Sequence, residues 1–223
     1  MSVHWKILAI FYDSQMAKSE EAGLRELRRG LVAQAAGDVL EIGAGTGANL
    51  EYYGPAVRSL AVTEPQPPML RRLEQHVRER APHATVLRAP AEDLPFEDDS
   101  FDVAVSTLVL CGVEDQRRAL RQLARVLRPG GRLLFLEHVR SDDARLAGWQ
   151  NRLNWLNRAL VCCECNRPTL DSIRSAGFEA TEVDHAVFPK APPFVRPLIF
   201  GVARLPQPTG QPAPGQSTVG SVG

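Results

Sequence analysis

The amino-acid sequence predicts an α/β fold in which helices cover both faces of a doubly wound, mostly parallel sheet. Short apolar runs alternate with amphipathic helical segments from residue 20 to residue 203, which is the pattern of strands joined by helical crossovers. The first apolar run, at residues 38–43, leads directly into closely spaced glycines, as is typical of the first strand of such sheets. A length of 223 residues suits one domain with a substantial core.

Each expected element rests on a local pattern. Leucines recur at helical spacing on one face of the first helix, and prolines open the second helix. The continuous apolar run at residues 103–110 is typical of a strand buried on both faces, and Arg128-Pro129-Gly130-Gly131 is a strong helix stop. The expected helices span residues 20–35, 67–80, 114–127, 146–161 and 169–176, and the expected strands span residues 38–43, 57–63, 85–89, 101–110, 132–139, 180–187 and 198–203.

The two ends of the chain differ from this pattern. We expect residues 1–36 to form an N-terminal lid and the first helix, residues 37–205 to form the main domain, and residues 206–223 to be disordered, because this tail is rich in Pro, Gly, Gln, Ser and Thr. The apolar stretch at residues 3–12 lacks a signal-peptide cleavage site and is shorter than the about 20 residues of a transmembrane helix. We therefore expect a cytoplasmic protein without a transmembrane segment, although this stretch could touch a membrane surface.

Composition narrows the choice of partners and ligands. The formal net charge is zero, so the sequence shows no basic footprint for nucleic acid and favours a small-molecule partner. Three of the four cysteines crowd together as Cys162, Cys163 and Cys165. A structural zinc site needs four converging ligands, usually as two pairs, and no second pair exists, so we expect no metal and interpret these thiols as buried or as lining a pocket.

The strongest local signal is the segment from Val39 to Gly47, in which an apolar strand runs into a glycine-rich turn. Closely spaced glycines permit a tight turn and let a ligand approach the backbone. Glu64 follows Gly47 by seventeen residues, at the end of the second strand. In doubly wound sheets a carboxylate at that place faces the ribose of a nucleotide. An ordinary strand-to-helix turn with a solvated glutamate is the alternative.

The same segment also fits a dinucleotide-binding pattern, because Gly43, Gly45 and Ala48 satisfy G-x-G-x-x-A. An NAD-dependent oxidoreductase is therefore a rival function. Glu41 argues against it, because its charge would repel a pyrophosphate but could hold a cationic ligand. The downstream chain also has no Tyr-x-x-x-Lys pair for hydride chemistry.

Four ordered motifs together resemble the class I S-adenosylmethionine-dependent methyltransferases of the type 11 domain: the glycine turn with Glu41, and residues 91–96, 100–102 and 127–131. The resemblance implies a seven-stranded sheet with an antiparallel last strand, S-adenosylmethionine as cofactor and S-adenosylhomocysteine as product. The acid that often contacts the adenine amine falls at Pro90, so Glu92 or backbone groups would take its place. The residues implied to bind the cofactor are Glu41, Gly43, Ala44, Gly45, Gly47, Asn49, Glu64, Pro65, Met69, Ala91, Glu92, Thr107 and Leu108.

Further matches at residues 12–17, 107–111, 136–139, 165–166 and 195–201 resemble the methyltransferase-like thiol S-methyltransferases. This second resemblance implies methyl transfer to a small-molecule thiol, such as that of a natural product. Three other functions stay open. They are O-, N- or C-methylation of a quinone, lipid or secondary metabolite, the oxidoreductase, and a catalytically idle cofactor-binding protein.

Methyl transfer to a thiol needs alignment more than strong base catalysis, because a free thiol has a pKa near 8.5. We expect His138, at the carboxyl end of the fifth strand, to be the catalytic base, with Asp13 closing over the substrate from the lid. A structural role is the alternative for both. The residues expected to line the substrate pocket are Tyr12, Cys111, Trp149, Cys165 and His185, with core packing as the alternative for Trp149.

Overall fold

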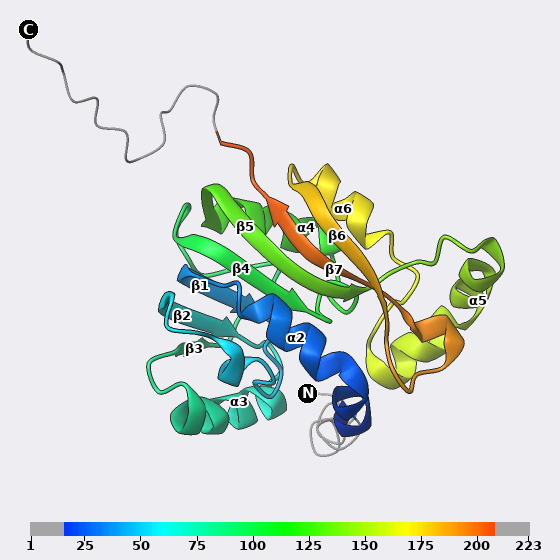
Figure 1. Ribbon diagram of the computed structural model, residues 1–223, viewed down its shortest axis with the longest axis horizontal. Coiled ribbons are helices and arrows are strands. Elements are labelled where there is room, and N and C mark those ends of the chain that lie inside the picture. Colours follow the sequence, from blue (N-terminus) through cyan, green and yellow to red (C-terminus); the bar gives the residue numbers. More distant parts are fainter. Residues whose placement is uncertain (1–15, 208–223) are drawn as a thin grey trace, which may run out of the picture.

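The computed structural model describes residues 16–207, and it confirms the predicted doubly wound sheet (Figure 1). Its seven strands lie in the order β3-β2-β1-β4-β5-β7-β6. The first five strands in chain order pair in parallel, whereas β7 runs antiparallel to both of its neighbours. The strands are β1 Gly37–Ile42, β2 Val57–Thr63, β3 Thr85–Leu87, β4 Phe101–Thr107, β5 Leu127–His138, β6 Glu179–Val187 and β7 Pro197–Arg204.

The longer helices match the predicted set with differences at their ends, and the short η2 and η3 were not predicted. The helix expected at residues 20–35 is divided, because Gly23 has a φ of 125° that interrupts regular helical geometry. The strand expected at residues 101–110 ends at Thr107, where Leu108 adopts a left-handed conformation with φ 61°. The helical elements are η1 Glu20–Leu24, α2 Arg25–Val32, η2 Leu50–Tyr52, α3 Pro67–Arg80, α4 Gln116–Val126, α5 Ala144–Val161, α6 Thr169–Ser175 and η3 Pro193–Val195.

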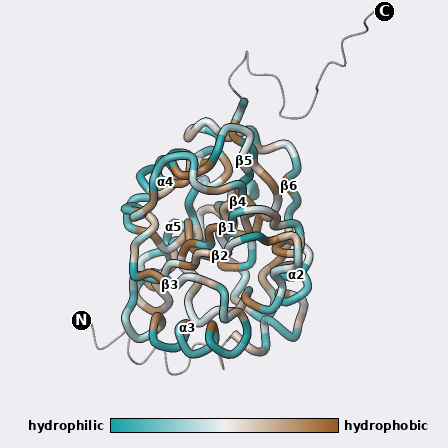
Figure 2. The backbone as a smooth tube through the Cα atoms, turned by 90° about the vertical axis from the view of Figure 1, so that its left-hand side faces the viewer, coloured by the Kyte–Doolittle hydropathy of each residue, from teal (hydrophilic) through white to brown (hydrophobic). Residues whose placement is uncertain are grey.

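Two hydrophobic cores lie on the two faces of the sheet. Successive side chains of a strand point to opposite faces, so Leu133 and Phe135 of β5 join the core under α4 and α6. Leu134 and Leu136 join the other core, under α2 and α3. Figure 2 shows the hydrophobic segments gathered at the central strands. Burial of both faces explains why the strands read as continuous apolar runs.

An ion-pair cluster holds the amino ends of the central strands together. Asp102, at the start of β4, accepts hydrogen bonds from the Asp38 backbone N–H at 2.8 Å and pairs with Arg128 at 2.7 Å. Asp38 pairs with both Arg58 and Arg128. The hydrogen bond with Arg58 holds the pKa of Asp38 well below its usual range. Two of the family-like motifs, at residues 100–102 and 127–131, therefore stabilise the sheet at the end opposite to the carboxyl ends of β1, β2 and β4.

The helix α5 is inserted between β5 and α6 and packs beside η3 at the margin of the molecule (Figure 1). Of the helices within residues 16–207, none combines the length and the apolar character needed to cross a bilayer.

Candidate active site

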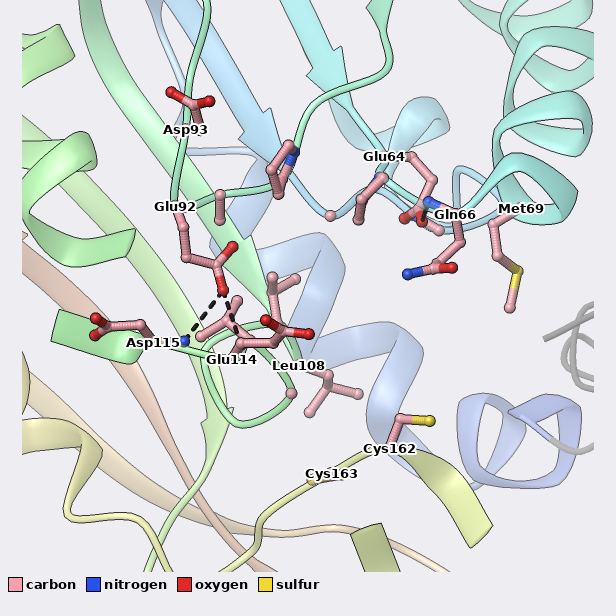
Figure 3. A pocket seen from close by; sticks show the side chains of 18 of the residues that line it. Glu64, Gln66, Met69, Glu92, Asp93, Leu108, Glu114, Asp115, Cys162 and Cys163 are labelled. Atoms are coloured by element: carbon pink, nitrogen blue, oxygen red, sulfur yellow. Dashed lines mark hydrogen bonds between the residues drawn. The ribbon is translucent and has the colours of Figure 1, made fainter. Parts of the chain in front are cut away.

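A cavity of about 620 Å³ opens at the carboxyl ends of β1, β2 and β4 (Figure 3). This is the edge at which doubly wound sheets bind their ligands, because the crossover loops leave a crevice there. The loops after these three strands form its walls, and the start of α4 and the segment after α5 complete it. The lining residues are Gly43, Gly45, Glu64, Pro65, Gln66, Met69, Pro90, Ala91, Glu92, Asp93, Leu108, Val109, Gly112, Val113, Glu114, Asp115, Arg118, Cys162 and Cys163.

The glycine turn after β1 supplies the floor of this cavity. Gly43 and Gly45 both adopt left-handed conformations, with φ 56° and 59°. A Cβ on Gly43 would lie 2.7 Å from Cγ1 of Val109, so only glycine fits the approach of the two loops. A Cβ on Gly45 would meet no protein atom within 4 Å, so it would project into free space that a ligand can fill. Ala44 and Gly47, which were also expected to bind the cofactor, belong to the turn but not to the cavity lining.

Glu64 lies at the end of β2 as predicted, and its carboxylate joins the two walls. One oxygen accepts a hydrogen bond from Gly45 N–H at 3.0 Å, and the other accepts from Gln66 N–H at 2.8 Å. The residue is 5% exposed, and this burial raises the pKa of its carboxyl to about 7, against the opposing effect of the two backbone hydrogen bonds. Glu64 is thus placed to accept hydrogen bonds from a pair of vicinal hydroxyls. Pro65 and Met69 add apolar surface to the cavity lining, and Figure 3 shows Met69 on the same side of the cavity as Glu64.

Glu92 lines the cavity, but its carboxylate is engaged within the protein. One oxygen accepts from the backbone N–H groups of Glu114 and Asp115, at 2.8 and 3.2 Å (Figure 3). These groups precede the first turn of α4, so Glu92 fixes the loop that forms one wall. Ala91 is buried beside it, and the exposed Pro90 also faces the cavity. The expected contact between Glu92 and an adenine amine stays a prediction.

A buried polar network lies behind the glycine turn. Asn49 donates to Glu41 at 2.8 Å and to Thr107 at 2.9 Å, and the Tyr53 hydroxyl donates to Glu41 at 2.7 Å. Arg28 donates to Thr107 at 2.7 Å and to Asn49 at 3.3 Å. The structure therefore brings together three residues expected to bind the cofactor, Glu41, Asn49 and Thr107, but none of them lines the cavity. Burial raises the pKa of the Glu41 carboxyl, while the hydrogen bonds and the charge of Arg28 oppose that rise.

Sequence reasoning missed Arg28, although a signal was present. Arg28 follows Leu24 by four residues and precedes Leu31 by three, which places it on the apolar face of the first helix. It is 4% exposed, and its Nε also donates to Glu20 at 2.9 Å. A cation on a buried face requires partners, and the network under the glycine turn supplies them.

Sequence reasoning also missed Glu137, which shapes the loop after β4. Its carboxylate accepts from the Ser106 hydroxyl at 2.6 Å and from the backbone N–H groups of Val109 and Cys111 at 3.1 and 3.3 Å. The side chain is fully buried, and burial raises the pKa of its carboxyl. The loop that it holds contributes Leu108, Val109, Gly112 and Val113 to the cavity. The signal was a lone carboxylate at the end of an apolar strand.

The four cysteines divide between the cavity and the interior. Cys162 and Cys163 line the cavity, whereas Cys111 and Cys165 are buried and do not. The hydrogen bond with Cys163 and burial raise the pKa of the Cys111 thiol well above its usual value. Burial raises the pKa of Cys165 to about 11. All four are free thiols, and no metal-holding cluster of three His, Cys, Asp or Glu side chains occurs within residues 16–207.

His138 lies at the end of β5, on the sheet face that packs against α2. Its ring contacts Phe188, with centroids 4.9 Å apart, and it is 5% exposed. Burial lowers the pKa of His138 to about 4, although hydrogen bonds with the backbone at Val195 and Pro197 oppose this effect. The ring is therefore neutral at pH 7, and it does not line the cavity. A role as catalytic base stays a prediction that this placement does not support.

The other expected substrate residues are dispersed. Trp149 does not line the cavity, because it projects outward from α5 with 58% of its surface exposed. His185 is exposed on β6 and borders a separate cavity near α6. Tyr12 and Asp13 lie outside the described residues, so their expected roles in a lid stay predictions.

Comparison with known proteins gives a consistent result. A family model described as a methyltransferase domain matches residues 40–135. Human thiol S-methyltransferase TMT1A is 33% identical over 200 residues, covering 87% of this chain and 81% of that protein. Human thiol S-methyltransferase TMT1B is 36% identical over 171 residues, covering 74% of this chain and 69% of that protein. The N-methyltransferase NodS from Bradyrhizobium japonicum WM9, solved in complex with S-adenosylhomocysteine, has a TM-score of 0.61 at 22% identity, covering 84% of this chain and 87% of NodS.

The cavity fits the cofactor that this family uses. The predicted contact of Glu64 with the two ribose hydroxyls is compatible with its place in the cavity lining, and the free space at Gly45 would let a ligand approach the backbone. Pro65, Met69 and Ala91 provide apolar surface for a base. The glycine pattern had left two hypotheses open, and the family match supports the methyltransferase over the NAD-dependent oxidoreductase. The chain belongs to the class I S-adenosylmethionine-dependent methyltransferases.

Proposed function

We propose that this methyltransferase transfers its methyl group to the sulfur atom of a small-molecule thiol. The observation that carries the proposal is the cavity wall on the side of the β4 loop and the segment after α5. Leu108, Val109, Val113, Cys162 and Cys163 make this wall apolar and polarisable. Such a wall suits a soft, weakly hydrated sulfur nucleophile. The names of the human relatives, both thiol S-methyltransferases, support the same acceptor.

The bound cofactor would supply an electrophilic methyl group on a sulfonium ion. The residues of this chain would position the two reactants. Glu64 and the glycine turn would hold the nucleoside, and the apolar wall would exclude water from the acceptor side. Leu108, Val109 and Cys163 would hold the acceptor sulfur in line with the transferable methyl group, and the thiol would give up its proton to solvent before it enters this apolar part of the cavity. Because a thiol has a pKa near 8.5, this deprotonation needs no strong base at neutral pH.

Acidic residues at the cavity mouth favour a neutral or cationic acceptor. Glu92, Asp93, Glu114 and Asp115 line the cavity, with Arg118 as the one cation among the described lining residues. This excess of negative charge attracts a cationic cofactor and repels an anionic substrate. We therefore expect neutral and amine-bearing thiols to be methylated in preference to carboxylate-bearing thiols of similar size.

The free thiols also support a reducing environment, and we propose the cytoplasm as the location of the enzyme.

The direct test is a panel of small thiols, with matched alcohols and amines, incubated with the purified protein and S-adenosylmethionine. We expect products only from thiols, with neutral and cationic thiols ahead of anionic ones. Methylation of an alcohol or an amine with no reaction at any thiol would refute the proposed acceptor while leaving the cofactor assignment intact. Equal rates for anionic and cationic thiols would refute the role of the acidic mouth alone.

A further inference from the structure

We propose that the exposed face of α5 is a docking surface for an anionic lipid bilayer. This inference does not depend on the identity of the methyl acceptor. The α5 face consists of Arg145, Trp149, Arg152, Trp155, Leu156 and Leu160. Three of its large apolar side chains are prominently exposed: Trp149 at 58%, Trp155 at 70% and Leu160 at 59%. Exposed tryptophans in a soluble domain usually mark a contact surface.

Helical geometry places these side chains on one surface. With about 100° per residue, the six positions fall within an arc of about 140° around the helix axis. They extend from Arg145 to Leu160, so the surface runs along most of the helix. In Figure 1, α5 lies at the margin of the molecule, beside η3 and apart from the sheet. A flat surface could therefore approach the α5 face along its length.

The charges on α5 favour phosphate groups as the polar partners. The helix contains three arginines and no acidic residue, and the acids Asp142 and Asp143 directly precede it, where the Asp143 carboxylate accepts a hydrogen bond from Leu146 N–H at the N-cap. Arg158, which borders the α5 face next to Trp155, pairs with Glu164 at 2.9 Å. Arg145 and Arg152 pair with no carboxylate among residues 16–207, so their guanidinium groups remain available. Tryptophan, leucine and unpaired arginine on one helix face are the composition of helices that lie in the membrane interface.

Two other possible partners of the α5 face match the charges of Arg145 and Arg152 less well. A second copy of the chain, packed about a two-fold axis, would bring four arginines together without a carboxylate from either helix. The segment of residues 1–15 contains Asp13 as its one acid and Lys6 as a compensating base, so it offers no net negative charge. An anionic bilayer supplies both the apolar depth for the tryptophans and the phosphates for the arginines.

The α5 helix is adjacent in the chain to residues of the active-site cavity. Cys162 and Cys163, which line that cavity, follow the last residue of α5 directly. The exposed Lys190 and Arg196, which flank η3, add positive charge beside the helix. Docking through the α5 face would thus hold the acceptor wall of the cavity near the lipid surface.

The three tryptophans of the chain provide a site-specific test. In the full-length Trp5→Phe variant, Trp149 and Trp155 are the only tryptophan reporters. We expect their fluorescence emission to shift to shorter wavelength when vesicles of phosphatidylcholine and phosphatidylserine are added, because both rings enter the interface. Vesicle sedimentation of the same variant would measure its affinity. Sedimentation with lipid but no emission shift would locate the contact outside α5 and overturn the proposal.

Charge variants test the arginines separately. Each basic residue near an anionic surface contributes about 1 kcal/mol to binding, which lowers the Kd by between five- and sixfold. The double variant Arg145→Gln/Arg152→Gln should therefore bind vesicles about 30-fold more weakly. The matched control is Arg117→Gln with Arg121→Gln, two exposed arginines on α4, which should bind vesicles like the wild type. Melting temperatures would confirm that each variant folds. Equal vesicle binding by the two double variants would refute a lipid-docking face. So would a wild-type protein that binds no vesicles but forms a dimer in solution, if Trp149→Ala/Trp155→Ala abolishes that dimer.

Discussion

Ionisation of Glu64 should control the affinity of the enzyme for its cofactor. Burial raises the pKa of this carboxyl to about 7 in the free protein. With that pKa, about one tenth of the molecules carry the carboxylate at pH 6 and about nine tenths at pH 8. Ribose hydroxyls donate hydrogen bonds, so they bind the ionised form. Affinity for S-adenosylhomocysteine should therefore rise about tenfold between pH 6 and pH 8, or by about 1.4 kcal/mol.

Isothermal calorimetry at several pH values would measure this dependence, using buffers of different ionisation enthalpy to count the protons released. Glu64→Gln should bind the product more weakly at pH 8, by roughly 10- to 100-fold, because it loses charge-assisted hydrogen bonds. It should also lose the pH dependence. Glu74→Gln, an exposed position on α3, is the matched control. An unchanged pH slope in Glu64→Gln would show that another group controls binding and would refute our assignment.

Four further outcomes are expected. The raised pKa of Glu64 means that the folded state binds a proton more tightly than the unfolded state. The stability that this proton contributes is present below about pH 4.5 and is lost as the pH rises through about 7. The melting temperatures of the wild type and of Glu64→Gln should therefore diverge over that range. Arg28→Gln should lower the free energy of unfolding by about 3 kcal/mol, because it removes a buried cation that pairs with Glu20 and donates to Asn49 and Thr107, whereas Arg29→Gln on the exposed side should have little effect in urea titrations. Asp102→Asn should lower the melting temperature near pH 7, and the difference should shrink as the pH falls through the titration range of this carboxyl, because a carboxyl with a lowered pKa stabilises the fold only above that range. His138→Asn should change kcat by less than about threefold with the pH profile unchanged, and a loss of 100-fold or more at unchanged cofactor affinity would restore His138 as the base.

The sequence predicted the parts of the site that depend on local spacing. The glycine turn and Glu64 lie where the pattern required, because a strand, a left-handed turn and the end of the next strand are set by short segments of chain. The left-handed Leu108 and the fold of its loop were not predictable in this way, because Glu137 on the neighbouring strand holds that loop. Such contacts depend on which strands become neighbours.

Burial was the second property that the sequence did not resolve. Asn49 and Thr107 were expected at the cofactor on the strength of a family resemblance; the structure shows them buried in a network completed by Arg28 and outside the cavity lining, and their contact with the cofactor stays a prediction. Similarly, Trp149 suits both a pocket wall and an outward helix face, because helical periodicity does not say which side of an inserted helix meets the domain. Only the packing of α5 beside η3 decides between them.

The order of the elements along the chain separates part of the acceptor wall from the residues expected to hold the cofactor. Everything that would hold the cofactor comes from residues before β5, whereas Cys162 and Cys163 enter the cavity from the insertion between β5 and α6. This insertion lies between β5 and α6 and contributes no strand, so it can be exchanged without changing the order of the sheet. Because Leu108, Val109 and Val113 of the acceptor wall precede β5, a chimera carrying a relative's insertion should acquire part of that relative's acceptor preference while keeping its own cofactor affinity.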